Sequence, residues 1–380
     1  MRILISGGGI AGLASAFWLG RRGVDLLIIE KAARFEPLGH FIALKAKGVE
    51  VIREMGLLDV CRKREASIRR IRYLTSSGKL LREADPADYE KTLGGYIFFR
   101  RADLHLALYE ALEGKVEIRY GTEVENVLGS GEGVTVSLSG GRVESADLLL
   151  GADGVHSRTR RLVFGEGYER PIGGRYIALT VDGTHRLEPG CLSVFLGWGQ
   201  QVALGAVSPR SVSGIVYHGD GGLEPRGKTN SEIKSFLIEA YAKFPRDVCD
   251  FFEAIDEGSF IFTDTINMVR MPSLVSGRVA LIGDAGYCPT FMSGMGSALA
   301  LQGARTFADS LGRSPDDVSD ALAEYERSIV PIARGFQQNA LKAKPVILGR
   351  NALPNLLRNA VVRFVPGSFL RKRARRFYQA

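Results

Sequence analysis

The first thirty residues constrain the fold of this chain more than any other stretch. A short apolar run, Ile3-Leu4-Ile5, is followed by a glycine-rich turn, Ser6 to Gly12, and by an apolar helical segment over residues 13–19. A second apolar run over residues 24–29 then ends at Glu30. The order strand, glycine turn, helix, strand and acid is typical of a βαβ unit that binds a dinucleotide.

Each residue type in this unit has a physical role. Gly7 makes the tight turn, Gly9 lets the backbone approach a pyrophosphate, and Gly12 lets the helix pack closely on the sheet. The helix N-terminus offers N–H groups and a positive dipole end to the phosphates. Glu30 lies about 20 residues on, where a carboxylate binds ribose hydroxyls, and this favours FAD or NAD over NADP. A glycine triplet alone is more often only a turn, so the prediction depends on the complete order.

Composition indicates a soluble globular chain. Its 380 residues are 45% hydrophobic and 24% charged, enough for two domains or for one domain with an elaborated second lobe. No apolar stretch approaches the ~20 residues of a membrane span, and a strand that begins at residue 3 leaves no room for a signal peptide, so we expect a cytoplasmic protein. The four cysteines lie far apart without metal-ligand or CxxC spacing, which predicts no metal site and argues against the disulfide-reducing flavoenzymes.

The net charge of +8 is concentrated at the C-terminal end. Glu326 is the last acid, and twelve Lys and Arg residues follow it, so the rest of the chain is mildly acidic. The basic balance therefore describes the tail, and no nucleic-acid partner is expected. Residues 369–378 place five positive charges among aromatics. A solvated helix end is favoured there over a membrane-surface contact.

Two further segments end in short polar motifs. The apolar run before Gly283-Asp284 resembles the opening strand, and Ser293-Gly294-Met295-Gly296-Ser297 then opens an alanine-rich helix. A strand-end aspartate accepts hydrogen bonds from a polyol, and a glycine-flanked helix start stabilises negative charge on a ring system. The plainer alternative is a strand, a loop and a capped helix. A third apolar run ends at Asp153-Gly154, which taken alone is an ordinary turn signal.

Together the three motifs resemble those of the class A flavoprotein monooxygenases, the family of para-hydroxybenzoate hydroxylase. The nucleotide motif of that family matches the opening unit, its GADGxxSxxR motif matches residues 151–160, and its GD motif matches Gly283-Asp284. The family's arginine that reaches the FAD phosphates falls on Arg101. Order and spacing agree over roughly residues 1–310.

This resemblance implies FAD as the cofactor, with NAD(P)H as a transient co-substrate and O2 as the oxidant. A flavin C4a-hydroperoxide then transfers OH to an electron-rich ring or attacks a ketone, so no catalytic triad is expected. The resemblance places at the cofactor Gly7, Gly9, Ile10, Ala11, Gly12, Glu30, Lys31, Lys45, Arg101, Asp153, Gly154, Gly283, Asp284, Pro289, Gly294, Met295, Gly296 and Ser297.

Within the family, residues 278–304 look most like the tetracycline-inactivating branch and its actinobacterial relatives. In that branch a basic residue lies near the flavin, a position that Lys45 fits, although a solvated loop lysine is the alternative. A C-terminal helix that braces the two domains also belongs to this branch, and residues 343–380 are its counterpart. The chain departs from the family pattern at Gly286-Tyr287-Cys288, at Thr290-Phe291 and at Met295. We take Lys45, Pro289 and Met295 as the candidates for catalysis.

The expected fold is α/β: a Rossmann-like FAD-binding domain, an inserted mostly antiparallel β-sheet substrate domain, and a C-terminal helix. The FAD-binding domain is assigned residues 1–70, 98–172 and 273–342, the substrate domain residues 71–97 and 173–272, and the basic helical segment residues 343–380. Aromatic residues on or beside the strands of the inserted domain are candidates to wall a pocket for a flat aromatic or polycyclic substrate, although core packing is the alternative for each: Tyr96, Phe98, Phe195, Trp198 and Tyr217.

Three other functions share this fold. A flavin-dependent halogenase requires a tryptophan-x-tryptophan motif, and Gly197-Trp198-Gly199 does not supply it. A reductase of isoprenoid lipids is supported only by the basic tail. A non-catalytic flavin-binding protein is compatible with the altered residues 286–295. The leading hypothesis is an FAD-dependent monooxygenase of an aromatic or polyketide-like small molecule.

Overall fold

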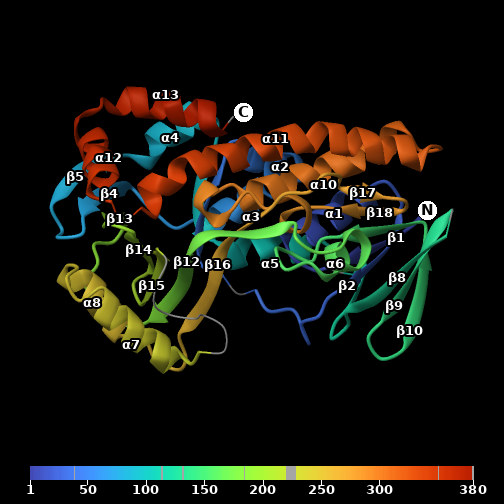
Figure 1. Ribbon diagram of the computed structural model, residues 1–380, viewed down its shortest axis with the longest axis horizontal. Helices are drawn as coiled ribbons and strands as arrows, with labels where there is room; N and C mark the ends of the chain where they lie inside the picture. Colours follow the sequence, from blue (N-terminus) through green and yellow to red (C-terminus); the bar gives the residue numbers. More distant parts are fainter. Residues whose placement is uncertain are drawn as a thin grey trace.

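The computed structural model describes residues 1–37, 39–112, 114–130, 132–183, 185–219, 228–349 and 351–378. Its first layer is a six-stranded sheet in the order β17-β18-β11-β1-β2-β7 (Figure 1). The bounds are β1 Arg2–Ser6, β2 Asp25–Ile29, β7 Glu117–Arg119, β11 Leu148–Gly151, β17 Val275–Ser276 and β18 Val279–Leu281. All pairs are parallel except β17 with β18.

The strands of this sheet are apolar without alternation because both of their faces are covered. Ile3, Ile5 and Leu150 pack against helices, whereas Leu4 and Leu149 pack against a second, three-stranded sheet. The helices on the first face are α1 Ile10–Gly20, α5 Arg101–Leu112 and α10 Gly296–Arg313, and the strands on the other face are β8 Val124–Ser130, β9 Gly133–Leu138 and β10 Arg142–Ala146. This is the doubly covered parallel sheet that the opening motif predicts.

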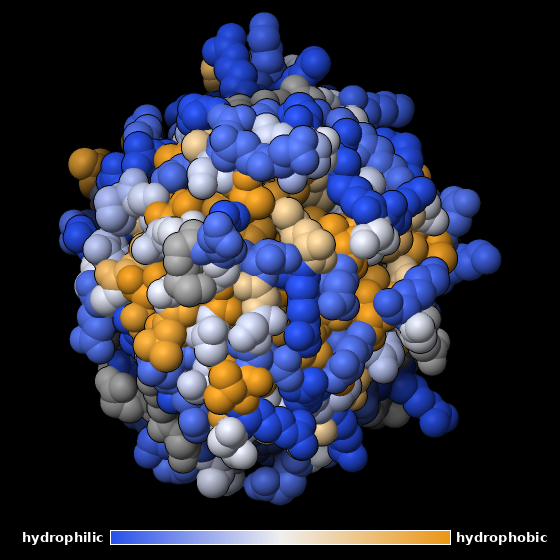
Figure 2. Space-filling model, turned by 90° about the vertical axis from the view of Figure 1, so that its right-hand side faces the viewer, coloured by the Kyte–Doolittle hydropathy of each residue, from blue (hydrophilic) through white to orange (hydrophobic). Residues whose placement is uncertain are grey.

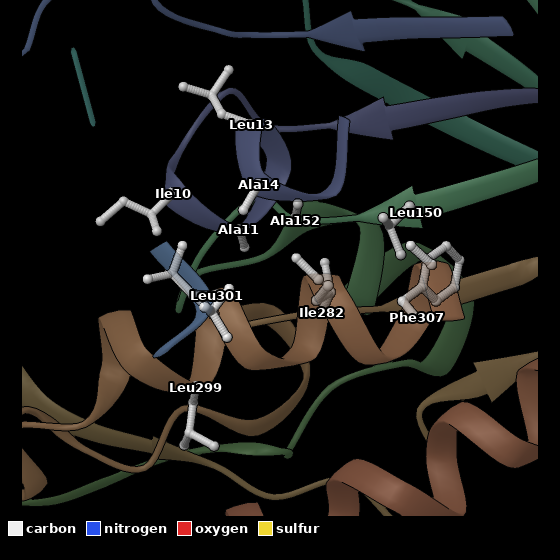
Figure 3. Close-up of a cluster of buried hydrophobic side chains, with 14 of the residues drawn as sticks. Ile10, Ala11, Leu13, Ala14, Leu150, Ala152, Ile282, Leu299, Leu301 and Phe307 are labelled. Carbon is white, nitrogen blue, oxygen red and sulfur yellow. The ribbon is translucent and has the colours of Figure 1, made fainter. Parts of the chain in front are cut away.

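Helices α1 and α10 approach closely where both begin. Ala11 and Ala14 of α1 lie near Ile282 and Leu301, with Ala152 of the β11 end between the two helices (Figure 3). Small side chains at this crossing let the two backbones come near each other. The N-termini of both helices therefore lie at the same end of the parallel sheet.

The inserted sheet has seven strands in the order β16-β12-β15-β14-β13-β4-β5, antiparallel except for β13 with β4. Its bounds are β4 Arg70–Thr75, β5 Leu80–Ala84, β12 Glu169–Asp182, β13 Cys191–Leu196, β14 Gln200–Ser208, β15 Ser211–His218 and β16 Phe260–Val269. Strand β12 continues across an irregularity between Pro171 and Arg175. The strand pair β3 Phe41–Lys45 and β6 Tyr96–Arg100 lies beside this sheet.

One face of the inserted sheet packs on two helices, α7 Asn230–Ala240 and α8 Arg246–Glu253. The alternation of strand side chains sends Val202, Leu204 and Val216 to this face and leaves Ala203, Ile215 and Tyr217 on the opposite one. The expected α/β fold with an inserted, mostly antiparallel sheet is confirmed. The division into six domain segments stays a prediction.

The C-terminal segment forms more than the single helix expected. Helix α11, Val318–Ile347, continues through Pro331 and Pro345, and two further helices follow it, α12 Ala352–Phe364 and α13 Gly367–Tyr378. Figure 1 shows α12 and α13 over the β4–β5 hairpin and α4. The remaining helices are α2 Lys47–Glu54, α3 Leu58–Lys63, α4 Pro86–Leu93, α6 Arg158–Phe164, α9 Asp284–Tyr287 and the 3₁₀ helix η1 Phe291–Ser293. Within the described part of the chain, no helix is both long and apolar enough to cross a bilayer.

Removal of one hydroxyl tests how α11 is held on the parallel sheet. The buried Tyr325 hydroxyl donates to the Leu281 carbonyl at 2.9 Å, at the end of β18. The change Tyr325→Phe leaves that buried carbonyl without this donor and is expected to lower the free energy of unfolding by about 1–3 kcal/mol. Urea unfolding of the two proteins measures the difference, and an unchanged midpoint would contradict this account.

Candidate active site

A cavity of about 1370 Å³ lies between the parallel sheet and the inserted sheet. Its first wall consists of the ends of β1, β2 and β11 with the N-termini of α1 and α10. Its second wall consists of β3, β6 and the face of the inserted sheet turned away from α7 and α8. The volume exceeds the ~300–1,000 Å³ of a usual small-molecule pocket. It has room for an extended cofactor together with a second molecule.

The glycine turn after β1 meets the requirements of a phosphate-binding loop. Gly7 has φ +107°, and a Cβ on Gly12 would lie 1.9 Å from the Gly7 carbonyl oxygen. A Cβ on Gly9 would meet no atom within 4 Å, so its backbone faces open space. Gly12 therefore allows the helix to pack, and Gly7, Gly9, Ile10 and Ala11 line the cavity.

Glu30 holds a fixed carboxylate at the end of β2. One oxygen accepts from the Gly8 N–H at 2.7 Å and the other from the Ala32 N–H at 2.8 Å. Glu30 and the neighbouring Lys31 both line the cavity. A carboxylate in this place is oriented for the hydroxyls of a ribose.

The starts of α1 and α10 both face the cavity, and the first turn of each contains no acid. Neither helix has a side-chain hydrogen bond at its N-cap, where Gly9 and Met295 lie. Both positive dipole ends therefore remain available to an anionic ligand. Lys45 at the end of β3 adds charge here, because a Cβ on Gly294 would lie 2.9 Å from the Lys45 Nζ.

Asp153 and Arg160 stabilise the loop after β11. Asp153 accepts hydrogen bonds from the Ser157 hydroxyl at 2.5 Å and from the Thr159 backbone at 2.9 Å. The buried Arg160 donates to the Ala285 carbonyl at 2.8 Å and pairs with Glu169 at 3.0 Å. This motif thus joins the parallel sheet, the inserted sheet and α9, while Asp153 and Gly154 line the cavity.

Two titratable groups near Arg101 have shifted pKa values. Burial raises the pKa of Asp284, although the Arg101 charge opposes this shift. Burial, with a smaller contribution from Arg101, lowers the pKa of His40 to about 3. His40 is therefore a neutral ring at physiological pH. Arg101, Asp284 and His40 all line the cavity, as do Pro289, Gly294, Gly296 and Ser297.

Two of the predicted site residues, Gly283 and Met295, lie behind the cavity wall and do not line it. Gly283 has φ +63°, and a Cβ there would lie 2.9 Å from that of Ala11, so this glycine permits the approach of two loops. Met295 is buried in the core, and its side chain does not reach the cavity. The backbone of Met295 caps α10 while its side chain packs inward, so the side chain of this candidate for catalysis lies behind the cavity wall.

The substrate candidates divide by strand face. Tyr96, Phe98 and Tyr217 line the cavity. Phe195 does not, because Val194 occupies the cavity face of β13 and the alternate position packs on α7 and α8. Trp198 does not either, because it lies in the turn after β13 and is 51% exposed. Phe195 and Trp198 therefore lie outside this cavity.

Sequence reasoning missed several lining residues. Tyr73 and Tyr176 face the cavity from β4 and β12, and strand alternation alone could have found them. Tyr378 comes from the end of α13, for which no local pattern exists, whereas Phe291 at the start of η1 lies in a segment that departs from the family pattern. His156 also lines the cavity and contacts two carboxylates, at 2.9 Å from Asp264 and 2.6 Å from Glu169.

The comparisons with known proteins agree with this geometry. Residues 1–340 match the family model described as FAD binding domain. The chain is 30% identical over 345 residues to a flavin-dependent monooxygenase from an unknown prokaryotic organism, covering 89% of this chain and 87% of the relative. This chain belongs to the class A flavin monooxygenase family.

Two solved structures extend the comparison. Klebsiella pneumoniae HpxO complexed with FAD and uric acid has a TM-score of 0.89 and 25% identity, over 100% of this chain and 97% of that one. Tetracycline destructase Tet(51) has a TM-score of 0.80 and 25% identity, over 98% and 97%. The chain is an FAD-dependent monooxygenase, a flavoprotein oxidoreductase, as the motifs predict.

The residues present fit FAD. The open backbone at Gly9 and the first turn of α1 suit its pyrophosphate, and the fixed Glu30 carboxylate suits its ribose. The first turn of α10, which like that of α1 lacks acids, suits its electron-rich ring. Arg101 and Asp284 also line the cavity, where the first could supply a cation to a phosphate and the second an acceptor to hydroxyl groups. The cavity continues beyond these residues to the inserted sheet.

A matched pair of glycines in α1 tests this fit. The change Gly12→Ala forces a methyl group onto the Gly7 carbonyl and is expected to weaken FAD binding by about tenfold or more, since overpacking costs about 1–3 kcal/mol. The change Gly20→Ala in the same helix meets nothing nearer than 3.8 Å and should leave FAD binding unchanged. FAD titration followed by flavin fluorescence compares them, and equal affinities would contradict the assignment.

His40 predicts a pH dependence of stability. Its folded pKa lies below the 6.5 of the unfolded chain, so stability falls as pH decreases from about 6.5 toward 3, by about 1.4 kcal/mol per unit. The change His40→Gln removes this contribution. The drop in urea midpoint between about pH 7.5 and pH 5, with saturating FAD, should be smaller in the variant than in the wild type. Equal drops would mean that His40 titrates normally.

Proposed function

We propose that this chain consumes NAD(P)H and O2 to hydroxylate an aromatic or polyketide-like small molecule. One observation carries the proposal: a single continuous cavity has the FAD-motif residues at one end and an aromatic wall at the other. A cofactor and a flat substrate held in this cavity would share one space from which the protein excludes water.

When bound, FAD supplies the redox chemistry: it takes a hydride from NAD(P)H, reacts with O2 and provides an electrophilic oxygen. The residues of this chain bind and polarise it. The first turn of α10 and the Lys45 ammonium stabilise negative charge on the ring of the reduced cofactor. Arg101 neutralises phosphate charge near Asp284 and His40.

Aromatic rings set the shape of the substrate end. Phe291 stacks on Tyr176 with ring centroids 3.9 Å apart and an interplanar angle of 10°. Phe41 stacks on Phe98 at 5.3 Å. Together these pairs give the cavity flat apolar surfaces, which favour a planar ring system.

Phenol groups supply the polarity of this end. Tyr73, Tyr96 and Tyr217 line the cavity, and burial raises the pKa of each, so each remains a neutral hydrogen-bond donor or acceptor. Tyr378 joins them from α13, with its ring 4.6 Å from the Lys45 Nζ. Phenol donors beside an ammonium favour a substrate with carbonyl, enol or phenolic oxygens.

The relatives support this substrate class without defining its member. The tetracycline destructases and the HpxO complex with uric acid concern different small molecules. The assignment of this chain to the tetracycline-inactivating branch is therefore part of the proposal. The halogenase alternative gains no support, since Trp198 lies on the surface. The isoprenoid reductase alternative predicts NAD(P)H oxidation without O2 uptake.

Substrate-stimulated turnover tests the proposal. A panel of phenolic and polycyclic compounds is added to the holoenzyme with NADPH or NADH under isotopically labelled O2. At least one compound should accelerate NAD(P)H oxidation and yield a product with one labelled oxygen atom. Oxidation without label in any product would contradict hydroxylation.

Tyrosine variants then locate the substrate. Tyr96→Phe and Tyr217→Phe each remove one phenol from the cavity and should raise the KM about fivefold to tenfold, since a hydrogen bond contributes about 1 kcal/mol. Flavin absorbance should not change. Tyr168→Phe is the matched control, because Tyr168 does not line the cavity. If the control raises the KM as much, the phenols do not contact the substrate.

A further inference from the structure

We propose that helix α12 and the basic residues of α13 form a docking surface for an anionic lipid membrane. Helix α12 has the reverse of the arrangement found in a soluble protein, where a surface helix buries its apolar stripe. Leu353 is 78% exposed and Phe364 is 73% exposed, whereas Asn355 is fully buried. Leu356, Leu357 and Val361 are exposed on the same stripe as Leu353 and Phe364.

The helical spacing makes this stripe continuous. The exposed apolar positions follow each other at intervals of three and four residues over three turns, so their side chains share one face. Phe369, at the start of α13, adds another exposed aromatic side chain. Such a contiguous apolar face is typical of an interaction site, whereas single exposed apolar residues are ordinary.

Buried polar contacts fix this orientation. Arg358 is buried on the opposite face of α12 and donates to the Val346 carbonyl at 3.0 Å and to the Gly197 carbonyl at 3.1 Å. Asn355 donates to the carbonyls of Gly349 and Asn351, each at 2.8 Å. Arg82 of β5 donates to the carbonyls of Val362 and Val365 at the end of the helix. Rolling the helix to bury its leucines would break the bonds that Arg358 and Arg82 make between α12 and the rest of the molecule.

The basic residues near this apolar stripe indicate what kind of partner would cover it. Arg363, Lys372, Arg373, Arg375 and Arg376 are exposed, and α12 and α13 contain no acid. Arg371 of the same helix pairs with Asp88 at 3.0 Å. Apolar side chains flanked by lysine and arginine are the composition of helices that lie in the interface of anionic membranes.

A second copy of the chain is a poorer occupant. An isologous contact through the stripe would bring the two basic clusters together, with no acid on either helix to neutralise them. An anionic lipid surface covers the leucines and complements the charge. Such a contact would be peripheral, because no helix in the described part of the chain is long and apolar enough to span a bilayer.

The opposite end of the molecule provides the control. Leu128 of β8 and Val143 of β10 are exposed to a similar degree as the α12 leucines, but they lie on the three-stranded sheet. Figure 2 shows the face at that end, where hydrophilic residues surround the hydrophobic ones. Substitution there removes exposed apolar area without touching α12.

Vesicle co-sedimentation of the FAD-bound protein tests the proposal. The wild type should bind vesicles of phosphatidylglycerol and phosphatidylcholine and bind pure phosphatidylcholine much less, with binding weakened by salt. The triple change Leu353→Ser, Leu357→Ser and Phe364→Ser should reduce binding at least tenfold. The changes Lys372→Gln, Arg373→Gln, Arg375→Gln and Arg376→Gln should reduce it by about fivefold per charge. The pair Leu128→Ser and Val143→Ser should bind like the wild type.

Retained FAD absorbance in each variant shows that the fold is intact. The proposal is overturned if the wild type does not bind anionic vesicles at low salt, or if the control pair loses binding as the α12 variant does. It is also overturned if the wild type sediments as a dimer without binding lipid and the α12 variant becomes monomeric. That last result would assign the stripe to a second copy of the chain.

Discussion

The close approach of three strand ends is the constraint on which this structure depends. A Cβ on Gly7 would lie 2.6 Å from the Ala152 carbonyl oxygen, and one on Gly151 would lie 2.8 Å from Leu281. A Cβ on Gly283 would likewise meet that of Ala11. Glycine at each strand end therefore allows the loops that follow β1, β11 and β18 to lie close together. The cavity begins there, and so does everything that the cofactor requires.

These strand ends were predictable because their signals are local. An apolar run followed by glycine and an acid specifies both the element and its end, so Glu30, Asp153 and Asp284 were placed at the cavity edge from sequence. The inserted sheet was predictable in class for the same reason. The face of each strand was not, because Phe195 and Val194 are both apolar and only the strand's register with β4 and β14 decides which one meets the cavity.

Residues brought together from distant segments gave no signal in sequence. Tyr378 contacts Lys45 although more than three hundred residues separate them in the sequence. His156 contacts Asp264, which belongs to β16. The orientation of α12 is of the same kind. Composition reveals a basic tail, but the buried bonds of Arg358 and Asn355 decide that the leucines face outward.

The departures from the family pattern separate into two groups once their neighbours are known. Tyr287 is buried behind the cavity, within hydrogen-bonding reach of the Tyr325 hydroxyl at 3.4 Å. A Cβ on Gly303 would lie 1.9 Å from the Tyr287 hydroxyl, so the glycine makes room for the tyrosine. Tyr287, Gly303 and Tyr325 thus form one packing unit, and Met295 belongs to the same core.

Cys288, Thr290 and Phe291 form the second group, because all three line the cavity. Burial raises the pKa of the Cys288 thiol, which keeps it neutral, and the thiol contacts the Asn267 carbonyl at 3.8 Å. It therefore contributes size and polarity, without a charge. Phe291 stacks on Tyr176 and lies near Tyr217 and His40. Of the altered residues, those of this second group are the ones that face the cavity, and Phe291 presents the largest surface among them.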